Sequence, residues 1–326
     1  MSLVTLALHS LSPMEVLKLG EKTDDQAFVV ATLGTFDGVH LGHQEVLGRT
    51  VTEARRRNLP SVALTFSGHP AQVLRPESAP LLLTTIEDRL RLIAECGIDR
   101  TYLIEFDNEF SNRTAKAFLE DVLLGEVRAK ALVFGPDLHF GYRREGNAEF
   151  LQGVGVDMAL ELVEVGEVRE MPLVLESISS TAIRRALLGG DVSHAARMLG
   201  RSYSVEGEVI MGDQRGRTLG FPTANIPVAR DRAWPSDGVY AGWFERPDGS
   251  SQPCAVNIGR RPTFHQHAEH SLLEAHLIDF DDDLYGELCK VSFAEFLRGE
   301  RRFDGIDSLV SQLKEDVSVV RRVLHC

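Results

Sequence analysis

One short stretch of the chain decides the fold class of its first half: Leu33-Gly34-Thr35-Phe36-Asp37-Gly38-Val39-His40-Leu41-Gly42-His43. It runs from an apolar segment that predicts a strand directly into a pattern that predicts a helix. Gly34 and Gly38 allow the backbone to turn tightly and to approach a ligand closely. A strand, a glycine loop and a helix in this order are typical of an α/β domain, which binds its ligand beyond the carboxyl ends of parallel strands.

The segments around this stretch continue the alternation of strands and helices. Near-continuous apolar character suits strands that are buried on both faces of a parallel sheet, and it recurs in four short runs. These runs are Ala27–Leu33, Ser61–Thr65, Thr101–Phe106 and Lys130–Phe134. Apolar residues at helical spacing lie within Val46–Ala54, Leu90–Gly97 and Ala115–Val122. We therefore predict an open parallel sheet with right-handed crossovers in the first half.

The second half of the chain changes character after Gly189-Gly190-Asp191. Strand-like runs follow one another without intervening helices, separated by turn residues, which indicates an antiparallel sheet or a small β-barrel. These runs are Tyr203–Met211, Gly238–Phe244, Pro253–Ile258, Ser271–Ile278 and Leu288–Ala294. A last helix is predicted at Leu309–Leu324, with Asp304 or Asp307 available to cap its start. We place the boundary near Leu188–Arg201 and expect domains of residues 1–190 and 195–326.

Length and composition agree with two globular domains. The chain has 326 residues, of which 43% are hydrophobic and 25% are charged. Its net charge of −13 argues against nucleic acid or an anionic membrane as a partner, because both repel an acidic chain. No apolar run reaches the roughly 18 residues of a transmembrane helix, no signal peptide is expected, and the four cysteines form no Cys-x-x-Cys pair. We expect a cytoplasmic protein, and the sequence leaves self-association open.

His40 and His43 lie three residues apart at the start of a predicted helix. That spacing places both imidazoles on one side of the first turn, where free backbone N–H groups and the helix dipole favour phosphate. Two imidazole donors there can stabilise charge that develops on a phosphoryl group in transfer. The alternative is that both histidines are exposed and incidental, as in many short motifs. A zinc site is disfavoured because a third ligand at suitable spacing is absent from the sequence.

The whole stretch resembles the His-x-Gly-His nucleotidylyltransferase superfamily, and its flanking residues resemble the bacterial bifunctional riboflavin kinase/FMN adenylyltransferases (FAD synthetases). Ile178–Arg184 is similar to the second signature of that superfamily, Ile-Ser-Ser-Thr-x-x-Arg. The resemblance implies a Rossmann-like nucleotidylyltransferase domain in which His40, His43 and Arg184 are catalytic. It also implies that ATP contacts residues of both motifs: Gly34, Phe36, Gly42, Ser180 and Thr181.

Two loops between these motifs match the family less closely. Thr65-Phe66-Ser67-Gly68-His69-Pro70 carries Gly68 where the family has a proline. Asp137-Leu138-His139-Phe140-Gly141 carries Leu138 where the family has an aromatic residue. The resemblance implies flavin contacts at three residues: Phe66, His69 and Asp137. Core packing is the alternative for the aromatic rings, including that of Phe140.

The β-rich half carries a second glycine-rich segment, Gly207–Asn225, whose backbone N–H groups can wrap phosphates. Its last residues, Gly216–Asn225, are similar to the riboflavin kinase signature, and a plain surface hairpin is the alternative. The hydroxyl of Thr223 and the amide oxygen of Asn225 are hard ligands of the kind that Mg²⁺ prefers. The resemblance implies ATP contacts at five residues: Gly212, Gly216, Arg217, Thr223 and Asn225.

Further stretches match the kinase family in order, at Asn257–Phe264, Glu274–Phe280 and Leu297–Glu300. The resemblance makes Glu274 the base that accepts the proton of the ribityl hydroxyl, and such a role suits a carboxylate near an attacking alcohol. A solvated strand residue is the alternative, because Glu274 alternates with apolar neighbours. Arg298 is implied to bind flavin.

The motifs keep the family's order over about residues 25–324, and we predict a bifunctional enzyme of FAD biosynthesis. With Mg²⁺ as cofactor, the second domain would phosphorylate riboflavin to FMN with ATP. The first would adenylylate FMN to FAD with a second ATP and release pyrophosphate. One alternative is a nucleotidylyltransferase for another phosphorylated acceptor, fused to a flavin- or nucleotide-binding β module. Another is a binding protein with an inactive α/β domain.

Overall fold

The computed structural model describes residues 14–21, 27–155, 157–168, 177–212, 216, 219–259 and 271–326, the side chains of Val228, Ser271 and Leu272 excepted. The chain divides into two compact units. The first comprises Met1–Pro80 and Thr84–Arg169, and the second comprises Leu81–Leu83 and Glu170–Cys326. The short segment Leu81–Leu83 therefore packs with the second unit, although the chain on both sides of it belongs to the first.

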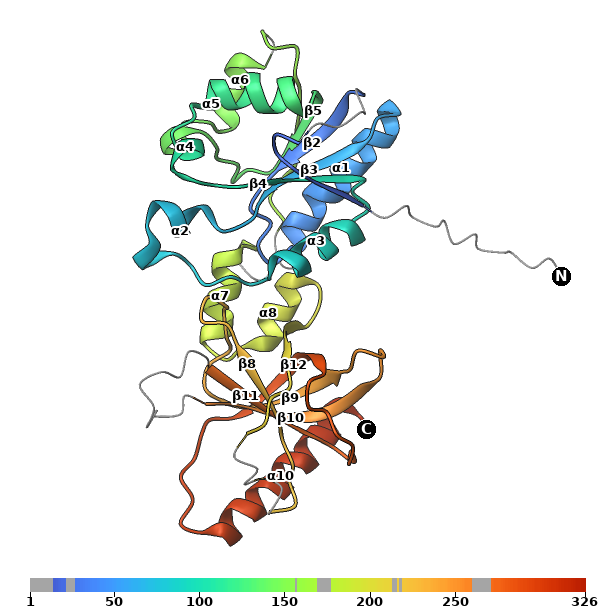
Figure 1. Cartoon of the computed structure of the whole chain (residues 1–326), viewed down its shortest axis with the longest axis vertical. Helices are drawn as coiled ribbons and strands as arrows, with labels where there is room; N and C mark the ends of the chain where they lie inside the picture. The colour runs from blue at the N-terminus through green and yellow to red at the C-terminus, as the bar shows by residue number, and fades with distance from the viewer. Residues whose placement is uncertain are drawn as a thin grey trace, which may run out of the picture. The chain divides into compact units, whose positions relative to one another are not determined.

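A parallel sheet forms the centre of the first unit (Figure 1), and its order among the described strands is β1-β4-β3-β2-β5-β6. The strands are β1 (Glu15–Lys18), β2 (Val29–Leu33), β3 (Ser61–Phe66), β4 (Arg100–Ile104), β5 (Ala129–Phe134) and β6 (Glu161–Glu164). The four central strands confirm the predicted parallel sheet. The edge strands β1 and β6 were not predicted, because they are short and partly exposed and lack the apolar run of a buried strand.

Helices cover both faces of this sheet (Figure 1). On one face, α1 (Leu41–Arg57) and α3 (Ile86–Glu95) pack against Ala63 of β3. On the other face, the π-helix η2 (Phe118–Glu126) and α6 (Ala148–Val154) pack against the neighbouring strand residues. The short helices are α2 (Pro70–Leu74), η1 (Pro76–Ser78), α4 (Asn108–Ser111), α5 (Ala115–Ala117) and η3 (Tyr142–Arg144). Both faces of the central strands are thus buried, as their continuous apolar sequence requires.

An antiparallel sheet forms the second unit, in the order β7-β12-β9-β10-β11-β8 among the described strands (Figure 1). These strands are β7 (Tyr203–Glu208), β8 (Ala224–Val228), β9 (Gly238–Glu245), β10 (Ser251–Gly259), β11 (Ser271–Leu277) and β12 (Leu288–Arg298). A bridge between Ile210 and Asn225 joins the two edges, so the sheet is a nearly closed barrel, as predicted. β8 was not predicted, because its residues follow a glycine-rich segment directly.

The second unit also contains the helices α7 (Ser180–Leu188), α8 (Val192–Leu199) and α10 (Ile306–Leu324). α8 packs on β7 and β12, and the backbone N–H of Ser236 donates to the carbonyl of Leu187 at 2.9 Å. α10 confirms the predicted last helix, and its Val320 packs against the barrel. The predicted cap is wrong: Gly305 is the N-cap and makes no side-chain bond, while Asp307 lies within the first turn.

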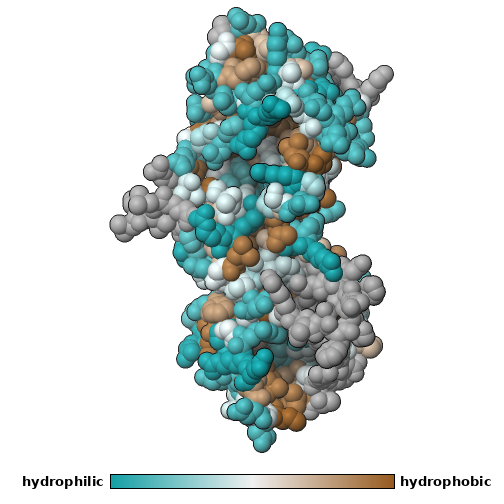
Figure 2. All heavy atoms as spheres, turned by 90° about the vertical axis from the view of Figure 1, so that its left-hand side faces the viewer, coloured by the Kyte–Doolittle hydropathy of each residue, from teal (hydrophilic) through white to brown (hydrophobic). Residues whose placement is uncertain are grey.

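α7 and α8 pack with the barrel, so the second compact unit starts before the predicted boundary. The compact units are defined by contacts between residues and not by activity. The functional boundary between residues 1–190 and 195–326 therefore stays a prediction. On the face drawn in Figure 2, hydrophilic residues cover most of the described surface and hydrophobic residues form small groups. Among the described helices, none combines the length and apolar character needed to cross a membrane.

Candidate active sites

The loop that follows β2 has a strained backbone. Phe36 and Val39 have φ values of 46° and 38°, in the left-handed region that Gly38 also occupies at 85°. A non-glycine residue in that region costs on the order of 1–3 kcal/mol and persists only where its surroundings fix it. The Phe36 and Val39 side chains are 2% and 1% exposed and pack with residues of α1 and α3. Burial therefore holds this loop in one shape where the chain enters α1.

The loop places the two histidines together at the start of α1. His40 is the N-cap, and its Nδ1 accepts a hydrogen bond from the backbone N–H of His43 at 3.2 Å. Because Nδ1 is the acceptor, a neutral His40 carries its hydrogen on Nε2. The two imidazole rings stack with centroids 3.6 Å apart and an interplanar angle of 18°. The pair thus forms a single unit beside the positive end of the helix dipole.

His43 is held in its neutral form. Burial lowers the pKa of His43 well below the ordinary value of 6.5, and electrostatic interactions with His40 and Arg89 lower it further. Its Nδ1 is buried, and no hydrogen-bond partner for this atom lies in the part of the chain that the structure describes. A buried polar atom without a partner is unusual, and at a functional site a ligand can supply the partner.

A buried polar network supports the same loop. Asp37 is 1% exposed, and its Oδ1 accepts hydrogen bonds from the backbone N–H and the hydroxyl of Thr84, both at 3.1 Å. The Thr84 hydroxyl accepts a bond from the backbone N–H of Gly38 at 3.1 Å. Arg89 Nη2 lies 3.9 Å from Asp37 Oδ1. Sequence reasoning missed Thr84 and Arg89, since neither lies in a motif and an arginine on an amphipathic helix normally faces solvent.

The loops after β3 and β5 flank the histidine loop, because these strands are the neighbours of β2 and parallel strands end at one edge. In the first loop, the Phe66 ring packs edge-on against Phe106 at 5.5 Å, and His69 caps α2 by accepting the N–H of Ala71. In the second, Asp137 is exposed. The structure therefore places these three predicted flavin residues at the sheet edge that carries the histidines.

The second phosphate signature lies on α7, in the other compact unit. Ser179 caps this helix by accepting the N–H of Ala182 at 3.2 Å, and Ser180 and Thr181 form the first turn. Arg184 Nε donates to the Leu81 carbonyl at 2.5 Å. The signature is therefore a capped helix start that carries the hydroxyl side chains of Ser180 and Thr181. The guanidinium of Arg184 is bound to the main chain of the same unit.

In the barrel, strand register aligns polar residues of three strands. Glu274 of β11 is the Cα partner of Asn225 on β8 and of Asn257 on β10. Directly opposed residues lie on the same face of a sheet, so the three side chains form a row. Asn257 was not among the predicted site residues, although it lies in a stretch that matches the kinase family. Only the register of the folded sheet reveals that it aligns with Glu274.

Two glycines let the glycine-rich segment approach this row. A Cβ on Gly212 would lie 2.5 Å from Asn225 Nδ2, and one on Gly216 would collide with the carbonyl oxygen of Phe221. Asn225 Nδ2 donates to the carbonyl of Thr223 at 3.2 Å. Gly212 therefore lies close against Asn225, and Gly216 lies close against Phe221 and Thr223. Arg217, a further predicted ATP contact, lies outside the described residues.

The donor set in the barrel fits Mg²⁺. Thr223 and Asn225 offer hydroxyl and amide oxygens, the hard ligands that this ion prefers. Among the described residues, no group of three or more His, Cys, Asp or Glu side chains could hold a metal ion. Mg²⁺ usually binds through one or two protein groups together with substrate phosphates and water, and does not require such a cage. The residues present thus suit an ion that arrives with ATP.

Arg298 makes an ion pair within the barrel unit. Its Nε and Nη2 donate to the two carboxylate oxygens of Asp316 on α10, at 2.9 and 2.6 Å. The two side chains are 13% and 6% exposed. Nη1 donates to the Gly299 carbonyl at 3.1 Å. In this structure the guanidinium fastens α10 to β12, and the flavin contact of Arg298 stays a prediction.

Comparison with known proteins finds two families in the chain. The FAD synthetase family model matches residues 22–182, and the riboflavin kinase family model matches residues 199–324. A bifunctional riboflavin kinase/FMN adenylyltransferase of Escherichia coli strain K12 is 38% identical over 296 residues, or 90% of this chain and 91% of that protein. A protein of the same name from Bacillus subtilis strain 168 is 34% identical over 316 residues, or 95% of each chain.

The architecture has a counterpart among solved structures. A crystal structure described as a macrolide-efflux protein from Streptococcus pneumoniae aligns with a TM-score of 0.84 and 32% identity. The alignment covers 94% of this chain and 99% of that one. The succession of parallel sheet and barrel is therefore shared over nearly the whole length.

Proposed function

The chain belongs to the family of bifunctional riboflavin kinase/FMN adenylyltransferases, and we propose that an N-terminal and a C-terminal part of the chain divide the two reactions. It phosphorylates riboflavin to FMN with ATP, and it adenylylates FMN to FAD with a second ATP and release of pyrophosphate. One observation carries the division: the kinase match falls within the barrel unit, and the FAD synthetase match spans the strands β2 to β6 and the start of α7. We assign adenylyl transfer to residues 1–190 and phosphorylation to residues 195–326.

Adenylyl transfer needs no covalent enzyme intermediate, so catalysis depends on placing the substrates and on stabilising the charge that develops. A phosphate oxygen of FMN forms a bond to the α-phosphorus of ATP, and the bond from that phosphorus to the bridging oxygen breaks. Pyrophosphate leaves with the electron pair. We propose that His40 and His43 donate hydrogen bonds to the reacting phosphates, which their place at the start of α1 supports. Two cationic rings 3.6 Å apart would repel each other, so at least one imidazole acts as a neutral donor.

The remaining predicted residues of this reaction have simpler roles. Gly34 and Gly42 would let the backbone approach the nucleotide, and Phe36, which is 2% exposed, would act through the backbone of its loop. Ser180, Thr181 and Arg184 would bind the leaving pyrophosphate, and hydroxyl and guanidinium donors suit that task. Phe66, His69 and Asp137 would hold the flavin.

In phosphorylation, we propose that Glu274 is the general base. It would accept the proton of the ribityl hydroxyl as that oxygen attacks the γ-phosphorus, and ADP would leave. Thr223 and Asn225 would hold Mg²⁺, which when bound neutralises charge on the ATP phosphates. The alignment of Glu274 with Asn225 across neighbouring strands supports this assignment. Gly212 and Gly216 would allow the loop to close over the phosphates.

We also propose that the enzyme works in the cytoplasm. Both reactions consume ATP, and all four cysteines are free thiols, as is usual in a reducing compartment. The net charge of −13 agrees with small-molecule substrates and not with nucleic acid or an anionic membrane.

Chromatography of the flavin products tests the function and the division together. The enzyme with riboflavin and Mg-ATP should yield FMN and then FAD, and with FMN and Mg-ATP it should yield FAD. His43→Ala should accumulate FMN from riboflavin, because loss of a donor at a developing charge costs about 10²–10³ in rate. Unchanged riboflavin and FMN with the wild-type enzyme would favour a different acceptor or a binding protein. An equal fall of both activities in His43→Ala would argue against the division.

A further inference from the structure

Arg89 is a charged side chain in the interior of the first unit. It is 1% exposed and belongs to the largest fully buried side chains of the described chain. A guanidinium does not lose its charge at any physiological pH, and its burial is costly unless it is paired. The roles assigned above do not use this residue. Its partners therefore indicate why an arginine lies there.

The guanidinium reaches two loops at the carboxyl edge of the sheet. Its Nη1 donates to the main-chain carbonyl of Phe66, where β3 ends and the predicted flavin loop begins, at 3.0 Å. Its Nη2 lies 3.9 Å from Asp37 Oδ1, in the nucleotide loop after β2. One planar guanidinium therefore contacts the ends of two neighbouring strands. Lysine could not do this, because its ammonium is a single point charge without a planar fork.

Thr84 also holds the nucleotide loop, which is the histidine loop that follows β2. Thr84 donates to Asp37 through its hydroxyl and its backbone N–H, and it accepts the N–H of Gly38. Thr84 is 4% exposed, so its contact with Asp37 is buried, like that of Arg89. Asp37 thus joins both supports in a loop that also contains two strained non-glycine residues. Such a loop keeps its shape only while its surroundings hold it.

We propose that Arg89 is a positioning residue for adenylyl transfer. By binding the Phe66 carbonyl and the Asp37 carboxylate together, it fixes the distance between the loop that holds FMN and the loop that holds ATP. The attacking phosphate oxygen then meets the α-phosphorus in line. This inference rests on the proposed function, because that function assigns the two loops to the two substrates. In addition, the charge of Arg89 helps to hold the pKa of His43 low.

The position of Arg89 predicts a specific kinetic signature. Arg89 contacts the main chain and Asp37, so its loss should leave the binding of each single substrate nearly intact. What should fail is their mutual alignment, and a misplacement of about 1 Å can cost about 10²-fold in rate. The turnover number should fall, while the KM values for ATP and FMN should stay within about threefold.

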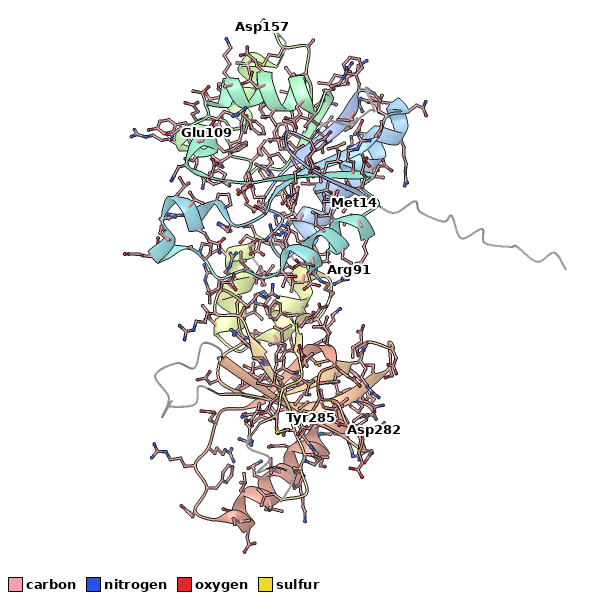
Figure 3. All side chains as sticks on the ribbon, in the orientation of Figure 1. Met14, Arg91, Glu109, Asp157, Asp282 and Tyr285 are labelled. Atoms are coloured by element: carbon pink, nitrogen blue, oxygen red, sulfur yellow. The ribbon has the colours of Figure 1, made fainter. Side chains whose placement is uncertain are left out.

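The test compares Arg89→Lys with Arg91→Lys in the full-length enzyme. Arg91, labelled in Figure 3, lies on the same helix, is exposed, and pairs with Asp88 and Glu95. Arg89→Lys should lower the kcat of FMN adenylylation about 10²-fold per folded chain, with riboflavin phosphorylation by the same sample unchanged. Arg91→Lys should change neither activity. Folded chain is counted by circular dichroism.

Two results would overturn the proposal. A kcat of Arg89→Lys within about threefold of wild type per folded chain would leave Arg89 a purely structural role. A rise of about tenfold in the KM for ATP or FMN at unchanged kcat would make it a ligand contact instead. If the wild-type enzyme formed no FAD from FMN and ATP, the proposed function itself would fail. The two failures are therefore distinguishable.

A second pair of variants covers the case in which Arg89→Lys does not fold. Thr84→Val removes the hydroxyl between Asp37 and Gly38 and leaves Arg89 unchanged. It should lower kcat about tenfold with both KM values nearly constant, and Thr84→Ser, which keeps the hydroxyl, should restore the rate. Equal rates for Thr84→Val and wild type would show that the shape of the loop does not set the rate, and the proposal would fall.

Discussion

The two candidate sites are built in opposite ways. In the parallel-sheet unit, the histidine loop is one continuous stretch, from the end of β2 to the first turn of α1, and its geometry follows from local backbone and burial. In the barrel, the site is a row across β8, β11 and β10, whose residues lie far apart in the sequence. A contiguous site tolerates changes elsewhere in its sheet, whereas a site made by register depends on every strand that sets the register.

The largest expected effect is the separation of the activities by truncation. Residues 1–190 lack Thr223, Asn225 and Glu274, and no riboflavin phosphorylation is expected from them. Residues 170–326 lack both histidines and should phosphorylate riboflavin but form no FAD. If residues 170–326 fold by tryptophan fluorescence, from Trp234 and Trp243, and yet have no kinase activity, the barrel site is incomplete without the first unit.

The starting point of the barrel piece sharpens this comparison. Residues 195–326 begin within α8 and lack α7, so they lose the buried side chains of Ile183, Leu187 and Val192. Each buried aliphatic side chain contributes about 1.5–3 kcal/mol. We therefore expect residues 170–326 to unfold at a higher temperature than residues 195–326. Equal melting temperatures would show that α7 contributes nothing to the barrel.

The next largest effect is expected from Glu274→Gln. Gln keeps the shape and one acceptor oxygen but is almost non-basic, so the rate of riboflavin phosphorylation should fall by about 10²–10⁴. Riboflavin affinity should change little, because the lost interaction is made mainly in the transition state. Adenylylation of supplied FMN should be unaffected. Glu295→Gln, an exposed glutamate on β12, is the matched control. Kinase turnover within a few-fold of wild type would make Glu274 a solvated strand residue.

The contrast between the sites also explains what the sequence could predict. The stretch from β2 to α1 carries strand, loop and helix signals side by side, and the central strands are apolar enough to be recognised singly. Glu274 could be selected only through resemblance, because its alignment with Asn225 and Asn257 is set by register. β8 was missed because the residues before it are glycine-rich.

The burial of Arg89 could not be predicted from the sequence of its helix. On α3 it is part of an Arg-rich sequence that predicts a solvated face, and Arg91 behaves in that way. Two residues away, Arg89 is buried because the Phe66 carbonyl and Asp37 meet beneath the helix. That meeting depends on the ends of two strands and a loop, none of which the helix sequence reveals. For the same reason, the Asp316 partner of Arg298 could not be predicted from the motif around Arg298.

A smaller effect on stability is expected from Asp316→Asn. The variant replaces the charged partner of Arg298, in a pair that is mostly buried, and should lower the free energy of unfolding of the barrel by about 2 kcal/mol. Tryptophan fluorescence in urea measures this, because Trp234 and Trp243 both lie in the second unit. Asp279→Asn is the control: it alters the exposed pair with Arg321, where a much smaller loss is expected because solvent screens the pair. Equal losses of unfolding free energy in both variants would show that the buried Arg298–Asp316 pair stabilises the barrel no more than the exposed pair does.

The smallest effect concerns the pH dependence of the parallel-sheet unit. The pKa of His43 in the folded chain lies well below its ordinary value of 6.5. Above about pH 6.5 the imidazole is neutral in both the folded and the unfolded chain, and it adds no pH dependence. Below that pH the unfolded chain binds a proton that the folded chain does not, so stability falls as the pH falls, by at most about 1.4 kcal/mol per pH unit. The loss ends once the pH is below the pKa of the folded state.

His43→Gln cannot take up this proton, so its stability should fall less than that of wild type between pH 7 and pH 5.5. Hydrogen exchange of amides in β2 and β5, followed by mass spectrometry, measures this unit alone, and tryptophan fluorescence of the barrel should show the same pH dependence in both proteins. Parallel pH profiles for β2 in wild type and His43→Gln would mean that His43 titrates as it does in water, and that burial of the histidine loop does not set its protonation.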